Sequence, residues 1–236
     1  MKLFYLPLLL LPFTGYAQGP MYQVDLHNQK IQITNPTFYV AEVIDLRINK
    51  STIGRVQRGL NNIPVPANFK DGAAVGLTKW LQTQLPAQPG SRPIIMRIHN
   101  LRIGEVTKVT SEKARAVVDV DFLVQQPDGQ YYVLLRHADE EIRGGIETTA
   151  FHDDNIAACL QRGLTLVNTL PWEQRLNNAR PLTAEQIRYA HGRVPEAYTY
   201  PILTAQTPKC GLYKSFLDFR HNQPDTAALF EIEKKP

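Results

Sequence analysis

The sequence lacks the short motifs that usually reveal an enzyme. It has no G-x-S-x-G elbow, no P-loop and no G-x-G-x-x-G turn, and neither of its 2 cysteines stands in a recognisable catalytic context. Internal repeats and low-complexity tracts are absent as well. These absences favour a binding protein over an enzyme.

A strong charge of one sign is also absent. The chain of 236 residues has 26 basic and 22 acidic side chains, a formal net charge of +4, and the excess is spread along its length. So small an excess gives little reason to expect a nucleic-acid partner. With 43% hydrophobic and 20% charged residues, the composition is that of a globular protein with a real core.

The longest apolar run stands near the N-terminus. Lys2 precedes the apolar stretch Leu3 to Phe13, and Gly15 and Ala17 put small residues where a signal peptidase reads them. We therefore expect residues 1–17 to be a signal peptide, cleaved after Ala17, and the protein to be periplasmic or secreted. The run is shorter than the roughly 20 residues that cross a bilayer, and no later stretch approaches that length. We expect no transmembrane segment after cleavage and, because no cysteine lies near the cut, no lipid anchor.

The two cysteines, Cys159 and Cys210, permit one disulfide in an oxidising compartment. Such a bridge would tie the C-terminal region to a helix. By closing the loop between the two cysteines, it would stabilise the fold by about 4 kcal/mol in the chain-entropy model. The alternative is that Cys159 is a small buried apolar residue, because it falls on the apolar stripe of that helix.

Apolar periodicity predicts an α+β fold. Alternating or continuous apolar patterns indicate strands at residues 30–34, 37–47, 52–56, 93–106, 116–124 and 131–137, and helical spacing indicates helices at residues 71–85 and 153–170. Asp71 is the expected N-cap of the first helix. Strands grouped around two helices favour an antiparallel or mixed sheet with both helices packed on one face.

Two details of the sheet follow from single residues. The strand at 93–106 is long enough to need a bend, and its alternation slips near His99 and Asn100. Pro127-Asp128-Gly129 predicts a tight turn between the last two strands, because proline presets φ and glycine takes a positive φ. We expect residues 18–170 to form the α+β domain and residues 171–236 to be a proline-rich, aromatic extension.

The extension carries the more specific of two resemblances. Thr183 and Gln186 form a capping box, and a second short helix is expected to open at Ser215. The run Gly211-Leu212-Tyr213-Lys214-Ser215-Phe216, followed by Phe219, Asn222 and Pro224, resembles a G-x-Y-x-[ST]-F-x-x-F-x-x-N-x-P segment of uncharacterised secreted proteins of Bacteroidota. There the segment opens a longer β-rich module, so the resemblance implies a truncated or minimal version here.

The front half resembles a second group. Val43-Ile44-Asp45-Leu46-Arg47 followed by Ile53-Gly54 is similar to the V-x-D-x-R...[IL]-G opening of YajG-like envelope lipoproteins, whose α+β domains also continue with a helix. The resemblance implies an envelope setting and supports the α+β fold. Neither group brings an assigned catalytic residue to carry over.

Candidate chemical groups are few, and each has a simpler structural explanation. His152-Asp153-Asp154 is the most metal-like cluster, but its donors are adjacent, so an aspartate capping the helix is favoured. His137 lies in a charged strand end that is most simply solvated. Asp119 and Asp121 are expected on a wet face, where Glu105 and Asp45 could join them as solubilising residues. We therefore expect no catalytic residue, no cofactor and no metal site.

Two surface features of the extension remain. Aromatic side chains crowd it and would suit contacts with a partner, although packing of these rings onto the domain is the favoured explanation; the candidates are Tyr198, Tyr200, Tyr213, Phe216 and Phe219. Asp225-Thr226-Ala227 resembles the acceptor used for O-glycosylation in Bacteroidota, which would make Thr226 the modified residue.

The sequence as a whole predicts a secreted or periplasmic, noncatalytic envelope protein that acts as a binding or assembly module for an unknown protein or polymer. The alternative is a small periplasmic hydrolase that uses His152 or His137 with nearby carboxylates. An enzyme would require several of these groups to converge at an accessible site.

Overall fold

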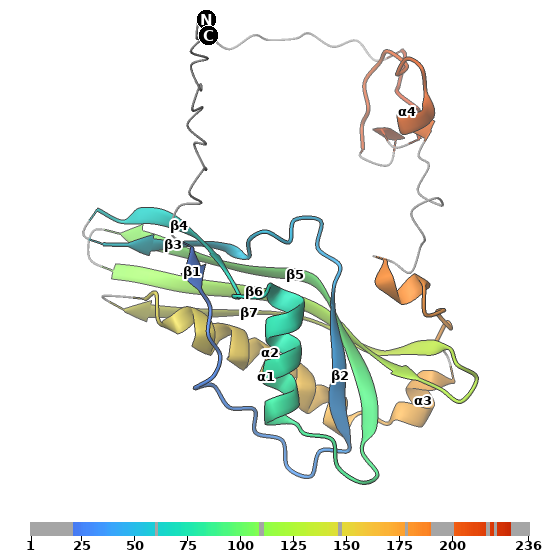
Figure 1. Cartoon of the computed structure of the whole chain (residues 1–236). Coiled ribbons are helices and arrows are strands. Elements are labelled where there is room, and N and C mark those ends of the chain that lie inside the picture. The colour runs from blue at the N-terminus through green and yellow to red at the C-terminus, as the bar shows by residue number, and fades with distance from the viewer. Residues whose placement is uncertain are drawn as a thin grey trace, which may run out of the picture. The chain divides into compact units, whose positions relative to one another are not determined.

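The structure is a computed structural model that describes residues 21–59, 61–108, 111–145, 148–177, 179–189, 201–215, 218–219 and 221–227 (Figure 1). The chain divides into two compact units. The first comprises the residues up to Phe122 together with Leu135–Pro171, and the second joins Leu123–Leu134 to Trp172–Pro236.

The fold is α+β, as the sequence predicts. Among the described residues, seven strands form one mixed sheet. Six of them follow the order β1 (Tyr22–Gln23), β4 (Ile63–Asn68), β3 (Gly54–Arg58), β5 (Arg92–Lys108), β6 (Ser111–Gln125) and β7 (Tyr131–Gly145), and β2 (Phe38–Asp45) pairs with β5.

Strand β5 is the centre of the sheet. β2 runs parallel to its first half, with Phe38 opposite Arg92, and β3 meets it further on, where Gly54 lies opposite Ile103. β6 lies along the other edge of β5 and is followed by β7, so that three long strands form the body of the sheet (Figure 1). The connections between these three strands are too short for a crossover, so they run antiparallel.

Both long helices lie on one face of this sheet (Figure 1). α1 (Ala73–Gln84) packs on β2, and α2 (Phe151–Thr169) packs on β7, where Gly163 lies under the His137 ring. A Cβ on Gly163 would stand 2.7 Å from that ring, so only glycine allows this close approach. None of the described helices is long and apolar enough to cross a membrane.

Residues 30–34 do not form the predicted strand. They pass between the two helices as an extended segment, in which Ile31 donates its N–H to Gln84 Oε1 and Gln32 donates its N–H to Gln161 Oε1. Glutamine side chains therefore take the backbone hydrogen bonds that a neighbouring strand would have taken.

The predicted helix caps are wrong in both cases. Asp71 lies one residue before the N-cap position of α1, which is Gly72 at φ 81°, and its carboxylate pairs instead with Lys79 at 2.8 Å. At α2 the N-cap position is Ala150 without a side-chain cap, and Asp153 and Asp154 lie inside the first turn. There their negative charges interact favourably with the positive end of the helix dipole, but neither side chain caps a specific N–H.

Strand β4 is absent from the sequence prediction because it contains two prolines, Pro64 and Pro66. Both lie opposite residues of β3, and β1 pairs with β4 only at Ala67 and Asn68. The prolines therefore lie in the part of β4 that pairs with β3 but, among the described residues, has no strand on its other side to receive an N–H.

The predicted irregularity in β5 is present in its burial pattern. Ile94, Met96 and Ile98 are buried, and the next buried apolar residues are Leu101 and Ile103, so the inward-facing positions change from even to odd. The change falls at residues 99–100, between the part of β5 that pairs with β2 and the part that meets β3.

The second unit begins with the hairpin tip between β6 and β7. Gly129, at φ 79°, donates its N–H to Gln126 O, which confirms the predicted turn. Tyr131 then exchanges two backbone hydrogen bonds of 2.8 Å with Leu182. The unit also contains the short helices α3 (Trp172–Leu176), η1 (Gln186–Arg188) and α4 (Pro201–Thr204).

The capping box is confirmed, because Gln186 N–H donates to Thr183 Oγ1 and Thr183 N–H donates to Gln186 Oε1.

The G-x-Y segment of the extension closes on itself. Tyr213 OH lies 2.8 Å from Asn222 Oδ1, its ring meets Phe219 edge to face at 5.3 Å, and Leu212 pairs with Asp225. Gly211, at φ 148°, has no room for a side chain against Pro224 and Asp225. Ser215 Oγ accepts the N–H of Asp218, as expected at a helix start. Local packing therefore explains Gly211, Tyr213, Ser215, Phe219 and Asn222, whereas Phe216 lies outside the described residues.

Replacing Gly54 with alanine tests the closest backbone contact in the sheet. A Cβ there would lie 1.9 Å from Ile103 O, and the φ of 145° is itself unfavourable for alanine. We expect Gly54→Ala to lower the free energy of unfolding by roughly 2–4 kcal/mol in urea titrations. Gly104→Ala is the matched control in β5, because no atom lies within 4 Å of its added Cβ. Equal stability of the two variants would contradict this account of the β3–β5 junction.

Candidate functional site

The structure brings together one histidine and one carboxylate that the sequence analysis treated separately. His152, in the first turn of α2, places Nε2 2.9 Å from Glu105 Oε1 on β5. Glu105 Oε2 also accepts the N–H of Gln57 at 2.5 Å. Because an ionised carboxylate only accepts hydrogen bonds, His152 Nε2 is the donor.

The His152–Glu105 pair is completely enclosed. The side chain of His152 is 0% exposed and that of Glu105 is 1% exposed. Burial by itself would raise the pKa of Glu105, but hydrogen bonds from His152 and Gln57 outweigh it and hold that pKa below its ordinary value. The carboxylate is therefore ionised and held between three elements of the fold.

More polar groups surround this pair. Tyr22 OH donates to the carbonyl oxygen of Thr149 at 3.3 Å, and Arg58 stands 5.0 Å from the centre of the Tyr22 ring. Burial, with Asp153 nearby, raises the pKa of Tyr22 to about 12. Burial likewise raises the pKa of Asp153 to about 6, although the N–H of Asp25 donates to its carboxylate.

A histidine oriented by a carboxylate is the usual general base of hydrolytic enzymes. Here the second ring nitrogen, His152 Nδ1, is buried too and has no hydrogen-bond partner among the described residues. A base must come within hydrogen-bond reach of the proton it takes, and neither side chain of the pair is open to solvent. The geometry therefore ties α2 to β5 and β3.

His137 forms the second histidine contact with a carboxylate. Its Nε2 lies 3.1 Å from Cys159 O and 3.4 Å from Asp139 Oδ2. Arg162 on α2 bonds Asp139 at 2.5 Å and Glu141 at 2.8 Å. Burial would raise the pKa of Asp139, but the Arg162 hydrogen bond dominates and lowers it. This network fastens β7 to α2.

Ion pairs also cross the face of the sheet that lies opposite the helices. Arg97 and His99 both meet Asp121, at 2.5 and 2.9 Å, and all three side chains are at least nine-tenths buried. Burial would raise the pKa of Asp121, but His99 and Arg97 together lower it. The predicted wet face is therefore partly buried at Asp121.

Nearer the edge of the sheet the same face is exposed. Asp119 pairs with Arg136 at 2.8 Å, and Glu140 pairs with Arg115 at 2.7 Å. The four carboxylates that were candidates to meet, those of Asp45, Glu105, Asp119 and Asp121, each have a different cationic or histidine partner. The sheet does not bring them together.

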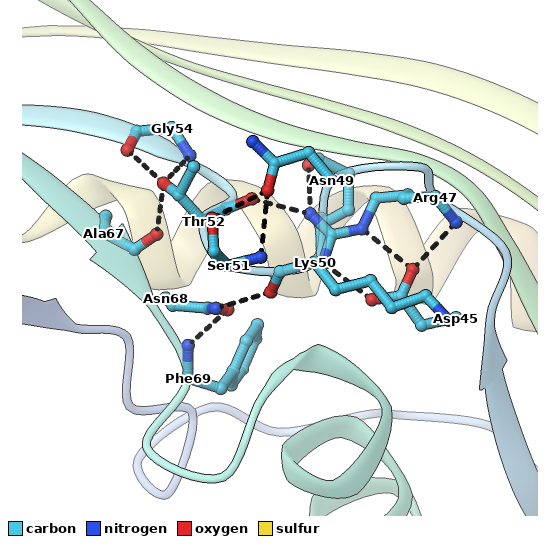
Figure 2. Close-up of polar contacts among 11 residues, drawn as sticks. Asp45, Arg47, Asn49, Lys50, Ser51, Thr52, Gly54, Ala67, Asn68 and Phe69 are labelled. Atoms are coloured by element: carbon cyan, nitrogen blue, oxygen red, sulfur yellow. Dashed lines mark hydrogen bonds and ion pairs between the residues drawn. The ribbon is translucent and has the colours of Figure 1, made fainter.

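Asp45 and Arg47 form the buried pair behind the V-x-D-x-R pattern. Figure 2 shows the Arg47 guanidinium directed at the Asp45 carboxylate, with contacts of 2.9 and 2.7 Å. Arg47 Nη1 also donates to Thr52 O and Leu101 O. The same loop is held from the other side by Asn68, which donates to Lys50 O at 3.0 Å. The pattern is therefore explained by the turn from β2 to β3.

The remaining predicted residues have simpler places. Cys159 is buried and Cys210 is exposed. Burial raises the pKa of Cys159 to about 12, which disfavours the reactive thiolate. Because the two cysteines belong to different units, their predicted bridge stays a prediction.

Of the predicted aromatic surface, Tyr213 and Phe219 contact each other, and Phe219 is 42% exposed. Tyr198, Tyr200 and Phe216 lie outside the described residues. Thr226 is exposed, next to a turn in which Asp225 Oδ1 accepts the N–H of Ala227, and its glycosylation stays a prediction.

No group of three or more metal-ligating side chains occurs in the part of the chain that the structure describes. Comparison of the chain with family models, curated proteins and solved structures finds no match. The resemblances to the Bacteroidota segment and to YajG-like lipoproteins therefore stay predictions, and function has to be argued from the geometry.

Replacing Asp153 with asparagine tests the buried acid beside His152. Its folded pKa, about 6, lies above the ordinary 3.8, so the folded state binds the proton more tightly than the unfolded state does. That stabilisation is present at low pH and is lost as the pH rises from about 4 to 6. Asparagine stays neutral, so Asp153→Asn should be more stable than the native chain at pH 7, by roughly 1–2 kcal/mol after allowance for partial exposure.

Urea unfolding at pH 4 and pH 7 measures this difference, which should vanish at the lower pH. Asp154→Asn is the control, because the neighbouring carboxylate bonds Arg143 and Gln29 and its loss should not stabilise the fold. An Asp153→Asn variant less stable than the native chain at pH 7 would contradict the assigned burial cost.

Proposed function

We propose that this chain is a secreted or periplasmic protein of the cell envelope that acts as a noncatalytic binding or assembly module. The observation that carries the proposal is the distribution of its polar groups. The histidine and carboxylate side chains suited to catalysis fasten α2 to the sheet, with His152 and Glu105 closed to solvent. Accessible charged groups, among them Arg115, Arg136 and Glu140, lie on the opposite face.

That open face has the composition of a contact surface. It presents Arg115, Arg136 and Glu140 together with two exposed apolar side chains, Val106 at 56% and Ile142 at 51% exposure. Arginine beside apolar residues is typical of protein interfaces. A protein or polymer of the envelope fits this description.

The cellular location rests on the N-terminal sequence. A short positive start, an apolar run and small residues before Gln18 together support export with cleavage after Ala17.

Site-specific photocrosslinking in the producing cells tests the proposal. A photoreactive residue at Val117, on the open face of β6, should give discrete adducts with an envelope component, and the exported protein should have an intact mass that begins at Gln18. The same residue at Lys79, exposed on α1, is the control and should give none of these adducts. Adducts of twice the mass of the chain are counted separately, because they report self-association.

The proposal fails if position 117 gives no adduct beyond the control, or if the exported protein retains residues 1–17.

The hydrolase reading keeps one observation in its favour, the 2.9 Å contact between His152 and Glu105 beside the protonatable Asp153. If this reading is correct, turnover of an ester, peptide or glycoside should fall by about 10²-fold or more in both His152→Asn and Glu105→Gln, in variants that remain folded by circular dichroism.

A further inference from the structure

We infer that two copies of this chain pair antiparallel along the outer edge of β7, with a two-fold axis at Ala138. The inference concerns an edge of the sheet and stands apart from the proposed function, which concerns its open face. It rests on three observations: the free backbone groups of β7, the order of its charges, and the ion pairs already present beside them.

β7 is the last strand in the sheet order and has one sheet neighbour, β6, among the described residues. Gln130 accepts a backbone hydrogen bond from Gln126 on the β6 side, whereas Tyr131 exchanges its two bonds with Leu182 on the other side. Strand residues alternate in this respect, so every second residue of β7 directs its N–H and C=O groups outward.

Side-chain burial changes at every residue from Leu134 to Gly145, so no bulge interrupts this part of β7. Beyond Tyr131, no backbone hydrogen bond on the outer side of β7 is formed by any residue in the described ranges. Residues 135–141 therefore present a row of donors and acceptors that a further strand can complete.

The charges of β7 decide which strand fits. Exposed strands usually carry charges that repel a chance neighbour, and here they are Arg136, Asp139, Glu140, Glu141 and Arg143. In an antiparallel pair centred on Ala138, Arg136 faces Glu140 of the second copy and His137 faces Asp139 of the second copy. Leu134 faces Ile142 in the same register.

Neighbouring registers are worse. Centring the pair on residue 139 or 140 places Asp139 or Glu140 opposite its own copy, and centring it on residue 136 does the same to Arg136. Like charges directly opposite each other are destabilising. Centring the pair on residue 137 sets Glu140 and Asp139 opposite leucines, whereas the register at Ala138 does so only for Glu141, which keeps its own partner Arg162. Centring the pair on Ile142 sets Glu141 opposite Arg143 but gives Arg136 no carboxylate and puts a bulky side chain at the axis. The register at Ala138 sets Arg136 opposite Glu140 and His137 opposite Asp139, and it leaves an alanine at the axis.

The existing ion pairs extend this match. On the open face Arg115 bonds Glu140 at 2.7 Å, and Arg136 bonds Asp119 at 2.8 Å. Across the proposed axis, Glu140 of one copy adjoins Arg136 of the other. The result is a row of alternating sign, from Arg115 and Glu140 of the first copy to Arg136 and Asp119 of the second. Such complementarity favours a second copy of this chain over an unrelated strand.

A pair of charge reversals tests the register. In Arg136→Glu alone, the introduced carboxylate would face Glu140 of the second copy, and in Glu140→Arg alone two guanidinium groups would face each other. Each variant should therefore dimerise at least about tenfold more weakly than the native chain. Mixed in equal amounts, the two variants should form a one-to-one heterodimer, because both contacts across the axis are then opposite in charge.

Sedimentation velocity of the full chain measures all three samples, and circular dichroism shows whether each variant is folded. A native chain that stays monomeric at high micromolar concentration overturns the inference. So does a mixture that associates no better than the variants alone.

A disulfide provides an independent test that needs no charge change. In a Cys210→Ser background, Ala138→Cys places two thiols directly opposite each other in the antiparallel pair, where Cα atoms lie about 4.5–5.5 Å apart, and mild oxidation should link the copies. Ile142→Cys is the control on the same exposed face of β7. Its two copies would lie about 26 Å apart, eight residues of strand, and should not be linked. Equal linking at both positions would overturn the register.

Discussion

The buried ion pair between Asp45 and Arg47 holds the one place where the edge of β5 passes from one neighbouring strand to another. Leu46 N–H still bonds Ile98 O at the end of β2, and Ile53 O already accepts Ile103 N–H at the start of β3. Between them no described strand pairs with Leu101 O, and Arg47 supplies its donor. Three further guanidinium hydrogens bond Asp45 and Thr52 O, so the arginine completes the sheet with a side chain.

Other buried ion pairs also join one element of the fold to another. Arg97 with Asp121 joins β5 to β6, and His152 with Glu105 joins α2 to β5. Removing such charges from water is expensive, and their mutual attraction rarely does more than offset that cost. What a buried pair does provide is geometric selection, because any other register of the strands would leave a charge without a partner. We therefore infer that the buried polar groups align the strands and helices. The open face of the sheet and the outer edge of β7 are the surfaces that we propose bind other molecules.

The sequence was informative where its pattern is periodic and local. Alternating burial from Ala116 to Val120, the turn at Gly129 and the helical stripe that contains Cys159 and Leu160 are all present in the structure, whereas the predicted wet positions Asp121 and Leu123 are buried. It misled where a side chain substitutes for a backbone partner, as Gln84 and Gln161 do for residues 30–34. It also failed at β4, because prolines oppose a strand prediction unless the empty side of the strand is known in advance.

The candidate site shows the same division. His152 and Asp153 could be singled out by residue type. The partner of His152, Glu105, lies 47 residues away in the sequence, and only the packing of α2 on β5 brings the two side chains together. No sequence pattern within either segment predicts that the two side chains meet. The spacing of Asp45 and Arg47, by contrast, is local, and their pairing could have been anticipated from side chains two apart at a strand end.

The most direct measurement of this account is a double-mutant cycle on Asp45 and Arg47, followed by urea unfolding at pH 7. We predict that Arg47→Met and Asp45→Asn each cost about 3–5 kcal/mol, since each leaves a buried polar group without its partner, and that the double variant costs little more than either. The exposed pair Lys79 and Asp71 is the control, and Lys79→Met should leave stability unchanged. Losses at Asp45 and Arg47 as small as the control, adding independently, would contradict the claim that this pair holds the junction of the sheet.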